Sequence, residues 1–394
     1  MDGLPSCPLL CLVQAIPSSS CSLLDIDCIC HDGPLFARVQ DCGMQNCTMK
    51  DNLKSMRLLY ETCDYPVTVA NDVFPAVIVA GVTLSSIAVT LRIAGRLIGS
   101  RLGLDDAVIM LSLAAAVAIA VIGLIEASLG LGKDVWFLSF DKITQILHAY
   151  FIAEALYITS IALSKMSMLL LFLRLFPDEN FRRATYLVLA FTTCWGLTVL
   201  FANVFACQPL SYYWNMWDGE HEGKCISQAS LLWAHAVINI LLDVVIIGLP
   251  THTLLKLNLS WRRKLAICSM FAVGIVVTIV SILRFVSSLH FDITDNPTKK
   301  FVPVGAWSLV EVYLSIICAC MPGIRAFFNY TWSRYYTKNS IYSSSPSASN
   351  GNSNGHSNGE VIPSPREVTS GTFHSANREQ GEFIRLQEIS SSKA

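Results

Sequence analysis

Charged side chains are scarce in this chain, at 14% of its 394 residues, whereas apolar side chains make up 53%. Soluble domains carry a charge on about a quarter of their residues, so the composition favours a protein that lies in a lipid bilayer. The formal net charge is -1, and the sequence lacks the clustered basic excess that a phosphate backbone attracts. We therefore expect the bilayer, and no nucleic acid, as a partner.

The sequence also lacks the motifs of common catalytic chemistries. It has no HExxH metal motif, GxSxG nucleophile, phosphate-binding loop or paired intramembrane aspartates. His221 and Glu222 have no second histidine nearby at metal-ligand spacing. Residues 303–325 contain no lysine that could hold retinal as a Schiff base. We therefore predict neither an enzyme nor a light-driven pump.

Long apolar runs are what the chain has in abundance. A helix of about 20 apolar residues crosses the hydrocarbon core of a bilayer. One such run could be a buried helix of a soluble protein, but seven in succession, separated by polar links, predict seven membrane-spanning helices. We expect them at about 73–97, 105–127, 146–171, 184–206, 229–251, 265–290 and 303–325.

Lysine and arginine are unequally divided between the two sets of predicted connections. Short loops rich in these residues stay in the cytoplasm, so we predict a multi-pass plasma-membrane protein with an extracellular N-terminus and a cytoplasmic C-terminus. The richer set has thirteen: Arg92, Arg96, Arg101, Arg174, Arg182, Arg183, Lys256, Arg262, Arg263, Lys264, Arg325, Arg334 and Lys338. The poorer set has five: Lys133, Lys142, Lys224, Lys299 and Lys300.

Cysteines crowd the N-terminus. Eight of the fourteen lie within residues 1–65: Cys7, Cys11, Cys21, Cys28, Cys30, Cys42, Cys47 and Cys63. This density indicates disulfides formed in an oxidising compartment, and zinc is disfavoured because His31 is the one nearby histidine. The spacing leaves the pairing open. Residues 1–20 lack the features of a secretory signal, so either a signal peptide precedes this sequence or the first membrane helix translocates the N-terminus.

The spacing C-x3-C-x9-C-x6-C-x-C-x11-C-x4-C-x15-C, with CSLLDIDCIC at 21–30, resembles the fungal CFEM domain. The resemblance implies a small helical module. It also implies the disulfides Cys7–Cys47, Cys11–Cys42, Cys21–Cys28 and Cys30–Cys63. In haem-binding members an aspartate four residues after the third cysteine binds the iron, and Asp25 stands there. The alternative for Asp25 is a helix cap or a solvated carboxylate, so haem is a possible cofactor, and no other is expected.

The ionisable residues within the predicted spans include Glu126, Glu154, Lys165, Asp243, Arg284 and Glu311. A charge at this depth costs several kcal/mol or more unless it is partnered, so we expect these six to form a polar bundle core. Glu154 and Lys165 are separated by about three helical turns, which puts them on one helix face. Interhelical structural pairing is one interpretation of the six, and a substrate or proton pathway is another.

The segment CQPLSYYWNMWDGEHEGKC at 207–225 is rich in Trp and Tyr, which favour membrane interfaces. A disulfide between Cys207 and Cys225 would pin this loop over the bundle mouth, as part of a ligand lid or as an interfacial belt. The one usable glycosylation sequon on the outer side is Asn46-Cys47-Thr48. A disulfide at Cys47 would limit the use of Asn46.

Several runs resemble the fungal seven-helix rhodopsin-like domain over about residues 70–330. They are LDD at 104–106, SKMSMLLLFLRLFP at 164–177, the 207–225 loop, NILLDVVIIGLP at 239–250, Arg284 and EVYLSIICACMPGIRAF at 311–327. The same architecture occurs in the fungal pathogenicity-related receptors. The chain lacks the DRY and NPxxY motifs of animal rhodopsin-class receptors, so coupling to a heterotrimeric G protein is implied by the family alone. Some members of the family, the satratoxin-cluster membrane proteins among them, are encoded in mycotoxin gene clusters.

We therefore predict an all-α membrane protein in three parts: an extracellular CFEM-like module at 1–65, a seven-helix domain at 66–332 and a disordered Ser/Asn/Gly-rich tail at 333–394. The predicted function is a receptor-like protein that senses an extracellular, surface or host cue through an unknown ligand. The alternatives are a membrane component or transporter associated with a secondary-metabolite cluster, or haem and iron acquisition through the CFEM module.

Overall fold

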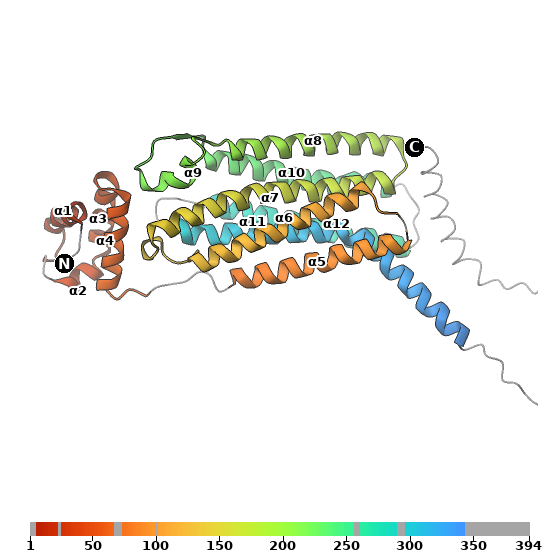
Figure 1. Ribbon diagram of the computed structural model, residues 1–394, viewed down its shortest axis with the longest axis horizontal. Coiled ribbons are helices and arrows are strands. Elements are labelled where there is room, and N and C mark those ends of the chain that lie inside the picture. The colour runs from red at the N-terminus through yellow and green to blue at the C-terminus, as the bar shows by residue number, and fades with distance from the viewer. Residues whose placement is uncertain are drawn as a thin grey trace, which may run out of the picture. The chain divides into compact units, whose positions relative to one another are not determined.

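A computed structural model describes residues 5–22, 25–66, 73–99, 101–255, 261–289 and 296–342, and Figure 1 shows that nearly all of these are helical. The chain divides into two compact units, Met1–Thr331 and Trp332–Ala394. The last helix runs through Tyr342, past the predicted domain boundary at 332. The rest of the predicted tail lies outside the described residues.

The N-terminal module is a set of short helices closed by disulfides. Its elements are α1 (Ser6–Ala15), η1 (Ile16–Ser18), α2 (Ile26–His31), α3 (Gly33–Asn46) and α4 (Met49–Thr62). Asp32 and Thr48 begin α3 and α4 by accepting hydrogen bonds from the backbone NH groups of Leu35 and Asp51. The buried apolar cluster of the module is small, and Leu35 is its most buried member. A core of this size needs covalent cross-links.

Seven long apolar helices follow, which confirms the predicted fold class. They are α5 (Phe74–Gly99), α6 (Leu104–Leu129), α7 (Phe140–Leu175), α8 (Glu179–Val204), α10 (Gln228–Leu255), α11 (Trp261–Leu289) and α12 (Pro297–Tyr342). Each contains a stretch long and apolar enough to cross a membrane. The helix α7 is longer than the predicted 146–171 because its backbone hydrogen bonds continue beyond the apolar run at both ends.

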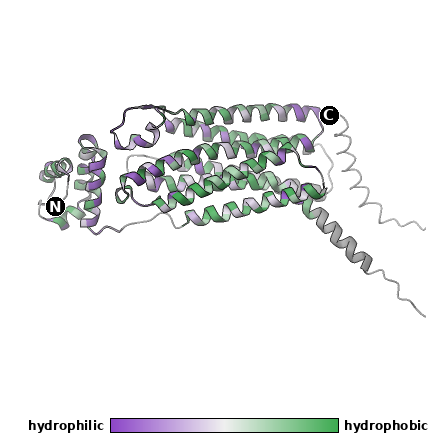
Figure 2. Ribbon diagram, in the orientation of Figure 1, coloured by the Kyte–Doolittle hydropathy of each residue, from purple (hydrophilic) through white to green (hydrophobic). Residues whose placement is uncertain are grey.

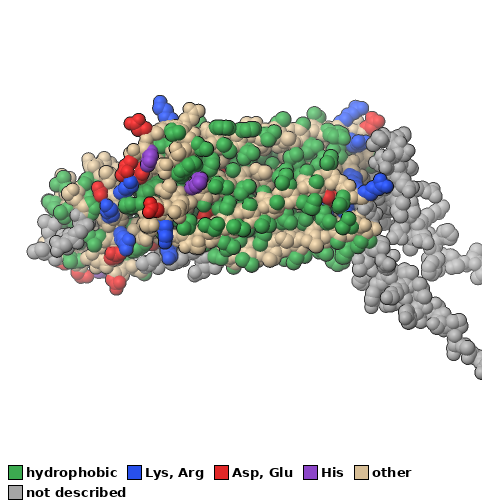
Figure 3. Space-filling view, viewed as in Figure 1, with side chains coloured by type: hydrophobic (Ala, Val, Ile, Leu, Met, Phe, Trp, Pro, Cys, Tyr) green, Lys and Arg blue, Asp and Glu red, His purple; other side chains and the backbone are tan. Residues whose placement is uncertain are grey.

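The outer surface of these helices is apolar. Leu187 is 73% exposed and Phe201 58% exposed, which is what a lipid-facing surface requires and a water-facing surface avoids. Figure 2 shows hydrophobic residues along the helices, and Figure 3 shows Lys, Arg, Asp and Glu side chains gathered toward the helix ends. The chain is therefore an integral membrane protein.

Small residues let helices approach closely inside the bundle. A Cβ atom added at Gly81 in α5 would overlap the ring of Tyr313 in α12. A Cβ atom at Gly323 in α12 would lie 2.8 Å from Cγ of Arg92 in α5. Close packing of this kind drives helix association in membranes, and at Gly323 it leaves room for a buried arginine.

The connection between α8 and α10 is compact. It contains β1 (Cys207–Gln208), α9 (Tyr212–Asn215), η3 (Met216–Asp218) and β2 (Lys224–Cys225). The strands pair antiparallel, with Cys207 opposite Cys225, and the two cysteines form a disulfide. The other notable connection, between α6 and α7, has a left-handed Gly130 (φ 112°) and η2 (Val135–Phe137).

Candidate functional site

Two of the predicted intramembrane charges form a direct ion pair. Lys165 in α7 places Nζ 2.8 Å from Asp243 Oδ1 in α10. The same ammonium group donates to the carbonyl oxygen of Asn239 at 2.8 Å. Both charged side chains are buried, so each depends on its partner in place of water. The pair ties α7 to α10.

Glu311 in α12 is fully buried and collects hydrogen bonds from three other helices. Its donors are the Tyr157 hydroxyl at 2.8 Å, Asn239 Nδ2 at 2.5 Å and Ser281 Oγ at 2.6 Å. Ser281 Oγ also lies 3.1 Å from Asp243 Oδ2. A hydroxyl has one proton to donate, and the backbone oxygen of Val277 is a third acceptor at 3.1 Å, so Ser281 serves at most one of these two carboxylates at a time.

Arg284 in α11 is held less completely than the other charges. Its NH1 lies 3.7 Å from Glu311 Oε2, beyond hydrogen-bond distance, and has no hydrogen-bond partner among the described residues. Its Nε donates to Ser308 Oγ at 3.1 Å, and its guanidinium carbon lies 4.3 Å from the centre of the Tyr157 ring. We call the following group the interior network: Tyr157, Lys165, Asn239, Asp243, Ser281, Arg284 and Glu311.

The two remaining predicted core residues have other surroundings. Glu154 Oε2 accepts a hydrogen bond from the hydroxyl of Tyr213 in α9 at 3.1 Å. Glu154 and Lys165 lie on the same helix but have different polar partners, Tyr213 and Asp243. Glu126 in α6 is 4% exposed, and its Oε1 has no hydrogen-bond partner among the described residues.

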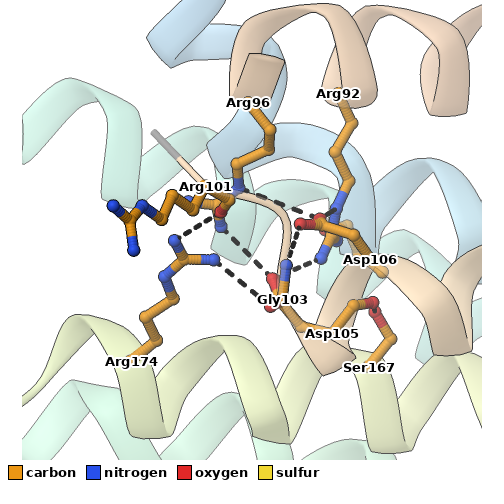
Figure 4. Close-up of polar contacts among 9 residues, drawn as sticks. Arg92, Arg96, Arg101, Gly103, Asp105, Asp106, Ser167 and Arg174 are labelled. Atoms are coloured by element: carbon orange, nitrogen blue, oxygen red, sulfur yellow. Dashed lines mark hydrogen bonds and ion pairs between the residues drawn. The ribbon is translucent and has the colours of Figure 1, made fainter. Parts of the chain in front are cut away.

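A second charged group lies where α5 ends and α6 begins (Figure 4). Arg92 in α5 is fully buried and holds two consecutive carboxylates of α6, with NH2 2.8 Å from Asp105 Oδ2 and Nε 2.9 Å from Asp106 Oδ1. Its NH1 donates to the carbonyl oxygen of Ala319 in α12 at 2.7 Å. One side chain therefore links three helices.

Further contacts extend this group to α7. Arg96 NH2 lies 3.2 Å from Asp105 Oδ2, and Arg174 NH1 lies 3.5 Å from Asp105 Oδ1. Ser167 Oγ donates to the backbone oxygen of Asp105 at 2.7 Å. We call Arg92, Arg96, Asp105, Asp106 and Arg174 the Arg92 cluster. The cluster has three arginines and two carboxylates, so the arginines share carboxylates.

The Arg92 cluster was missed as a site from the sequence. Arg92 and Arg96 were counted with the basic residues of the first connection although both fall within the predicted span 73–97, and the structure places both inside the span Phe74–Ile98. The LDD run at 104–106 was noted only for its resemblance. An arginine inside an apolar run, followed by two adjacent aspartates at the start of the next run, is the signal that could have found the cluster.

A buried histidine was also missed. His235 in α10 is 3% exposed, and neither ring nitrogen has a hydrogen-bond partner among the described residues. Its ring stacks on Trp195 with centroids 4.8 Å apart and meets the Tyr157 ring edge-on at 5.8 Å. It therefore packs as an aromatic neighbour of the interior network.

The 207–225 loop contacts the N-terminal module through charges. Lys50 Nζ in α4 lies 2.6 Å from Glu220 Oε2 and 3.7 Å from Asp218 Oδ2. The hydrogen bond with Glu220 raises the pKa of Lys50. Burial alone would raise the pKa of Asp218, but hydrogen bonds from the Glu220 backbone and from His221, with the charges of His221 and Lys50, lower it overall.

The cysteines of the module are paired as the CFEM resemblance implies. The bonds are Cys7–Cys47, Cys11–Cys42, Cys21–Cys28 and Cys30–Cys63. Asp25 is exposed at the start of α2, where Oδ1 accepts a hydrogen bond from Cys28 N at 3.1 Å. This is a helix-capping position; the capping bond uses one of the two carboxylate oxygens, so it is compatible with iron ligation by Asp25, and haem binding stays a prediction. Asn46 is exposed at the end of α3, and its amide donates to the Cys42 carbonyl oxygen at 3.0 Å.

The fold and the buried charges define a seven-helix integral membrane protein with a cysteine-rich N-terminal module. Residues 91–330 match the model of the fungal rhodopsin domain, and the chain belongs to this family. Residues 1–64 match the model of the CFEM domain. No solved structure matches the chain.

Curated fungal proteins match part of the chain. A SAT4 family membrane protein of Emericella nidulans is 31% identical over 47% of this chain and 47% of its own length. Satratoxin biosynthesis SC1 cluster protein 4 of Stachybotrys chartarum is 29% identical over 41% of this chain and 58% of its own. Receptor GIN3 of Arthrobotrys oligospora is 26% identical over 52% of this chain and 50% of its own. The chain thus spans about half the length of the curated relatives it matches.

Proposed function

We propose that this protein is a receptor-like protein of the plasma membrane that responds to an extracellular ligand and is not itself a catalyst. The proposal places the CFEM-like module outside the cell and the C-terminus in the cytoplasm, as the distribution of basic residues favours. The name of one relative, Receptor GIN3, is consistent with it.

The interior network carries the proposal. It joins α7, α10, α11 and α12 through charged and polar side chains, and some of these side chains do not have all their hydrogen bonds satisfied. Ser281 is shared by two carboxylates, and Arg284 stands 3.7 Å from Glu311 with one nitrogen unpaired among the described residues. A small shift of α11 would let Arg284 close on Glu311 while Ser281 turns to Asp243. Such discrete alternatives are what a ligand with different affinity for two packings can select.

The experiment compares the transcripts and proteins of a deletion strain complemented with different variants, with and without host or surface cues. Asp243→Asn removes one charge of the network with little change in volume. Glu222→Gln, on the exposed part of the 207–225 loop, is the matched control. We expect Asp243→Asn to change the cue-dependent response at near-normal surface abundance. A response identical to that of the control would contradict the proposal.

The cytoplasmic partner in this proposal is a heterotrimeric G protein, which rests on the family alone. Co-purification of a tagged full-length chain with Gα subunits, with and without guanosine triphosphate, tests it. We expect the complex to dissociate when the nucleotide is added. A pull-down that never contains Gα would leave the receptor with another cytoplasmic partner.

A membrane component or transporter of a secondary-metabolite cluster is the second candidate. It is favoured by relatives named for such clusters, those of satratoxin in Stachybotrys chartarum and of polyenoic acids in Metarhizium anisopliae. Buried charges also occur along transport pathways. If the Asp243→Asn strain responds normally to cues but retains a metabolite that the parent exports, the transporter function replaces the receptor function.

A further inference from the structure

A cavity of about 490 Å³ opens at the end of the bundle that carries the 207–225 loop. Pockets of roughly 300–1,000 Å³ are the size that encloses small organic ligands. Its walls are mostly apolar and aromatic. They include Leu53, Met56, Leu147, Tyr150, Trp217 and Phe301. The ring centroids of Tyr150 and Phe301 lie 4.4 Å apart with the ring planes tilted by 40°, so the two rings give the cavity an aromatic surface for the hydrophobic body of a ligand.

Among the polar groups that line this cavity, which also include the donor Trp136 Nε1, Glu154 and Asn203 offer hydrogen-bond acceptors. Glu154 has one carboxylate oxygen 3.1 Å from the Tyr213 hydroxyl. Asn203 is 2% exposed, and its Oδ1 has no hydrogen-bond partner among the described residues. Both residues belong to the cavity lining. A buried acceptor without a donor is unfavourable, and a ligand that donates hydrogen bonds would relieve it.

The charges of the lining residues indicate which class of ligand the cavity favours. Among the described lining residues Glu154 is the one carboxylate, and none is Lys, Arg or His. An anionic ligand, such as a fatty acid, would meet a carboxylate and no cation. A cationic head group would meet both a carboxylate and the faces of aromatic rings, which attract cations.

We propose that this cavity binds a hydrophobic amine. Its apolar body lies against Tyr150, Trp217 and Phe301, and its amino group donates hydrogen bonds to Glu154 and to Asn203 Oδ1. The site deepens the receptor proposal and rests on it for its biological meaning. Glu154 stands on α7, the helix that also carries Lys165 of the interior network, so the ligand would contact a helix whose position the network holds.

The test measures binding by the purified full-length protein in lipid nanodiscs, with empty nanodiscs as background. Three fluorescent probes share a dansyl body and differ in their end group: dansylcadaverine ends in an amine, dansylated aminocaproic acid in a carboxylate, and N-pentyl dansylamide in a methyl group. We expect the amine to bind about tenfold or more tightly than the other two, as a charged hydrogen bond contributes. Equal affinity for the three probes would overturn the proposal.

Two variants locate the binding site. Glu154→Gln keeps the side-chain shape and should weaken dansylcadaverine binding about tenfold or more while the affinity for N-pentyl dansylamide stays the same. Glu222→Gln, outside the cavity lining, should change neither. Unchanged amine affinity in Glu154→Gln would refute the assignment.

A third variant covers the case in which Glu154→Gln does not fold. Leu53→Trp, on the module side of the cavity, fills the space and should abolish specific binding of dansylcadaverine. Retained binding would place the amine elsewhere. The binding assay and the cue-response assay can fail independently. If Glu154→Gln loses the amine but its strain responds normally to cues, the binding site stands and the amine is not the cue that the receptor detects; the receptor function itself is contradicted only by the Asp243→Asn test.

Discussion

Replacing Arg92 with methionine tests the structural role of the Arg92 cluster. Methionine fills a similar volume with an apolar chain, so the change removes the charge and leaves the packing against Gly323 largely intact. The two carboxylates that Arg92 holds, at 2.8 Å and 2.9 Å, lose their shortest charged contacts, and the Ala319 carbonyl oxygen loses the bond from the guanidinium. Arg92 has no exposed surface, so water does not replace it.

The expected loss of stability follows from the burial of Arg92. Removing one partner of a buried ion pair costs about 3–5 kcal/mol, because the other charge stays buried without compensation. For a domain of this size each kcal/mol moves the unfolding midpoint by about 2–4 °C, so we expect a decrease of about 6–20 °C. Arg174→Met is the control. Arg174 contacts Asp105 at 3.5 Å and is 28% exposed, so its loss should cost about 0–1 kcal/mol.

The assay is thermal unfolding of the purified full-length protein in detergent micelles at one fixed heating rate, since unfolding of such proteins is often irreversible. The double variant Arg92→Met/Asp106→Asn removes a carboxylate that has lost its closest charged partner and, among the described residues, keeps only the charge of Arg96 at 3.8 Å, and it should recover part of the decrease. The reasoning is refuted if Arg92→Met unfolds within about 2 °C of Arg174→Met, or if the added Asp106→Asn lowers the midpoint further.

Three other outcomes are expected. Cys225→Ser should leave Cys207 as a free thiol that reacts with a maleimide and should lower the unfolding midpoint, because the bond closes a loop with a sequence separation of 18; an unreactive thiol would contradict the pairing. The contact of Lys50 with Asp218 should persist through neutral pH. The pKa of Asp218 in the folded protein is lowered from 3.8, so the stabilisation that its carboxylate contributes is present above pH 3.8 and is lost as the pH falls through the lowered pKa. The raised pKa of Lys50 keeps the ammonium group charged up to and beyond pH 10.5. Hydrogen exchange of α4 as a function of pH measures this, and protection that weakens near neutral pH would contradict it. A tag after Ala394 should be inaccessible on intact cells and accessible after permeabilisation. Labelling of the tag on intact cells would contradict the predicted cytoplasmic C-terminus.

The seven helices could be predicted because the bilayer imposes their length. Every backbone polar group inside a membrane must be bonded within its own helix, so a run of about 20 apolar residues is a signal that needs no tertiary context. The helix ends were less accurate. The start of α7 at Phe140 precedes its apolar run, because a helix can begin with polar turns that hydropathy does not register.

The partners of the buried charges were decided by tertiary structure alone. The sequence shows that Lys165 and Glu154 share a helix face, but their separate partners, Asp243 and Tyr213, come from segments distant along the chain. Hydropathy could not show that Arg92 lies inside the bundle, because an arginine near the end of a span reads equally well as a loop residue.

Composition and spacing thus determine what each segment is: an apolar helix, a cysteine module, a loop rich in Trp and Tyr. These are local properties, since burial in lipid and disulfide density depend on nearby residues. Which helices meet depends on side-chain shape over the whole bundle, as at Gly323, where the absence of a side chain admits Arg92. The cavity beside Glu154 and Asn203 is likewise a product of packing between segments, and no stretch of sequence contains it.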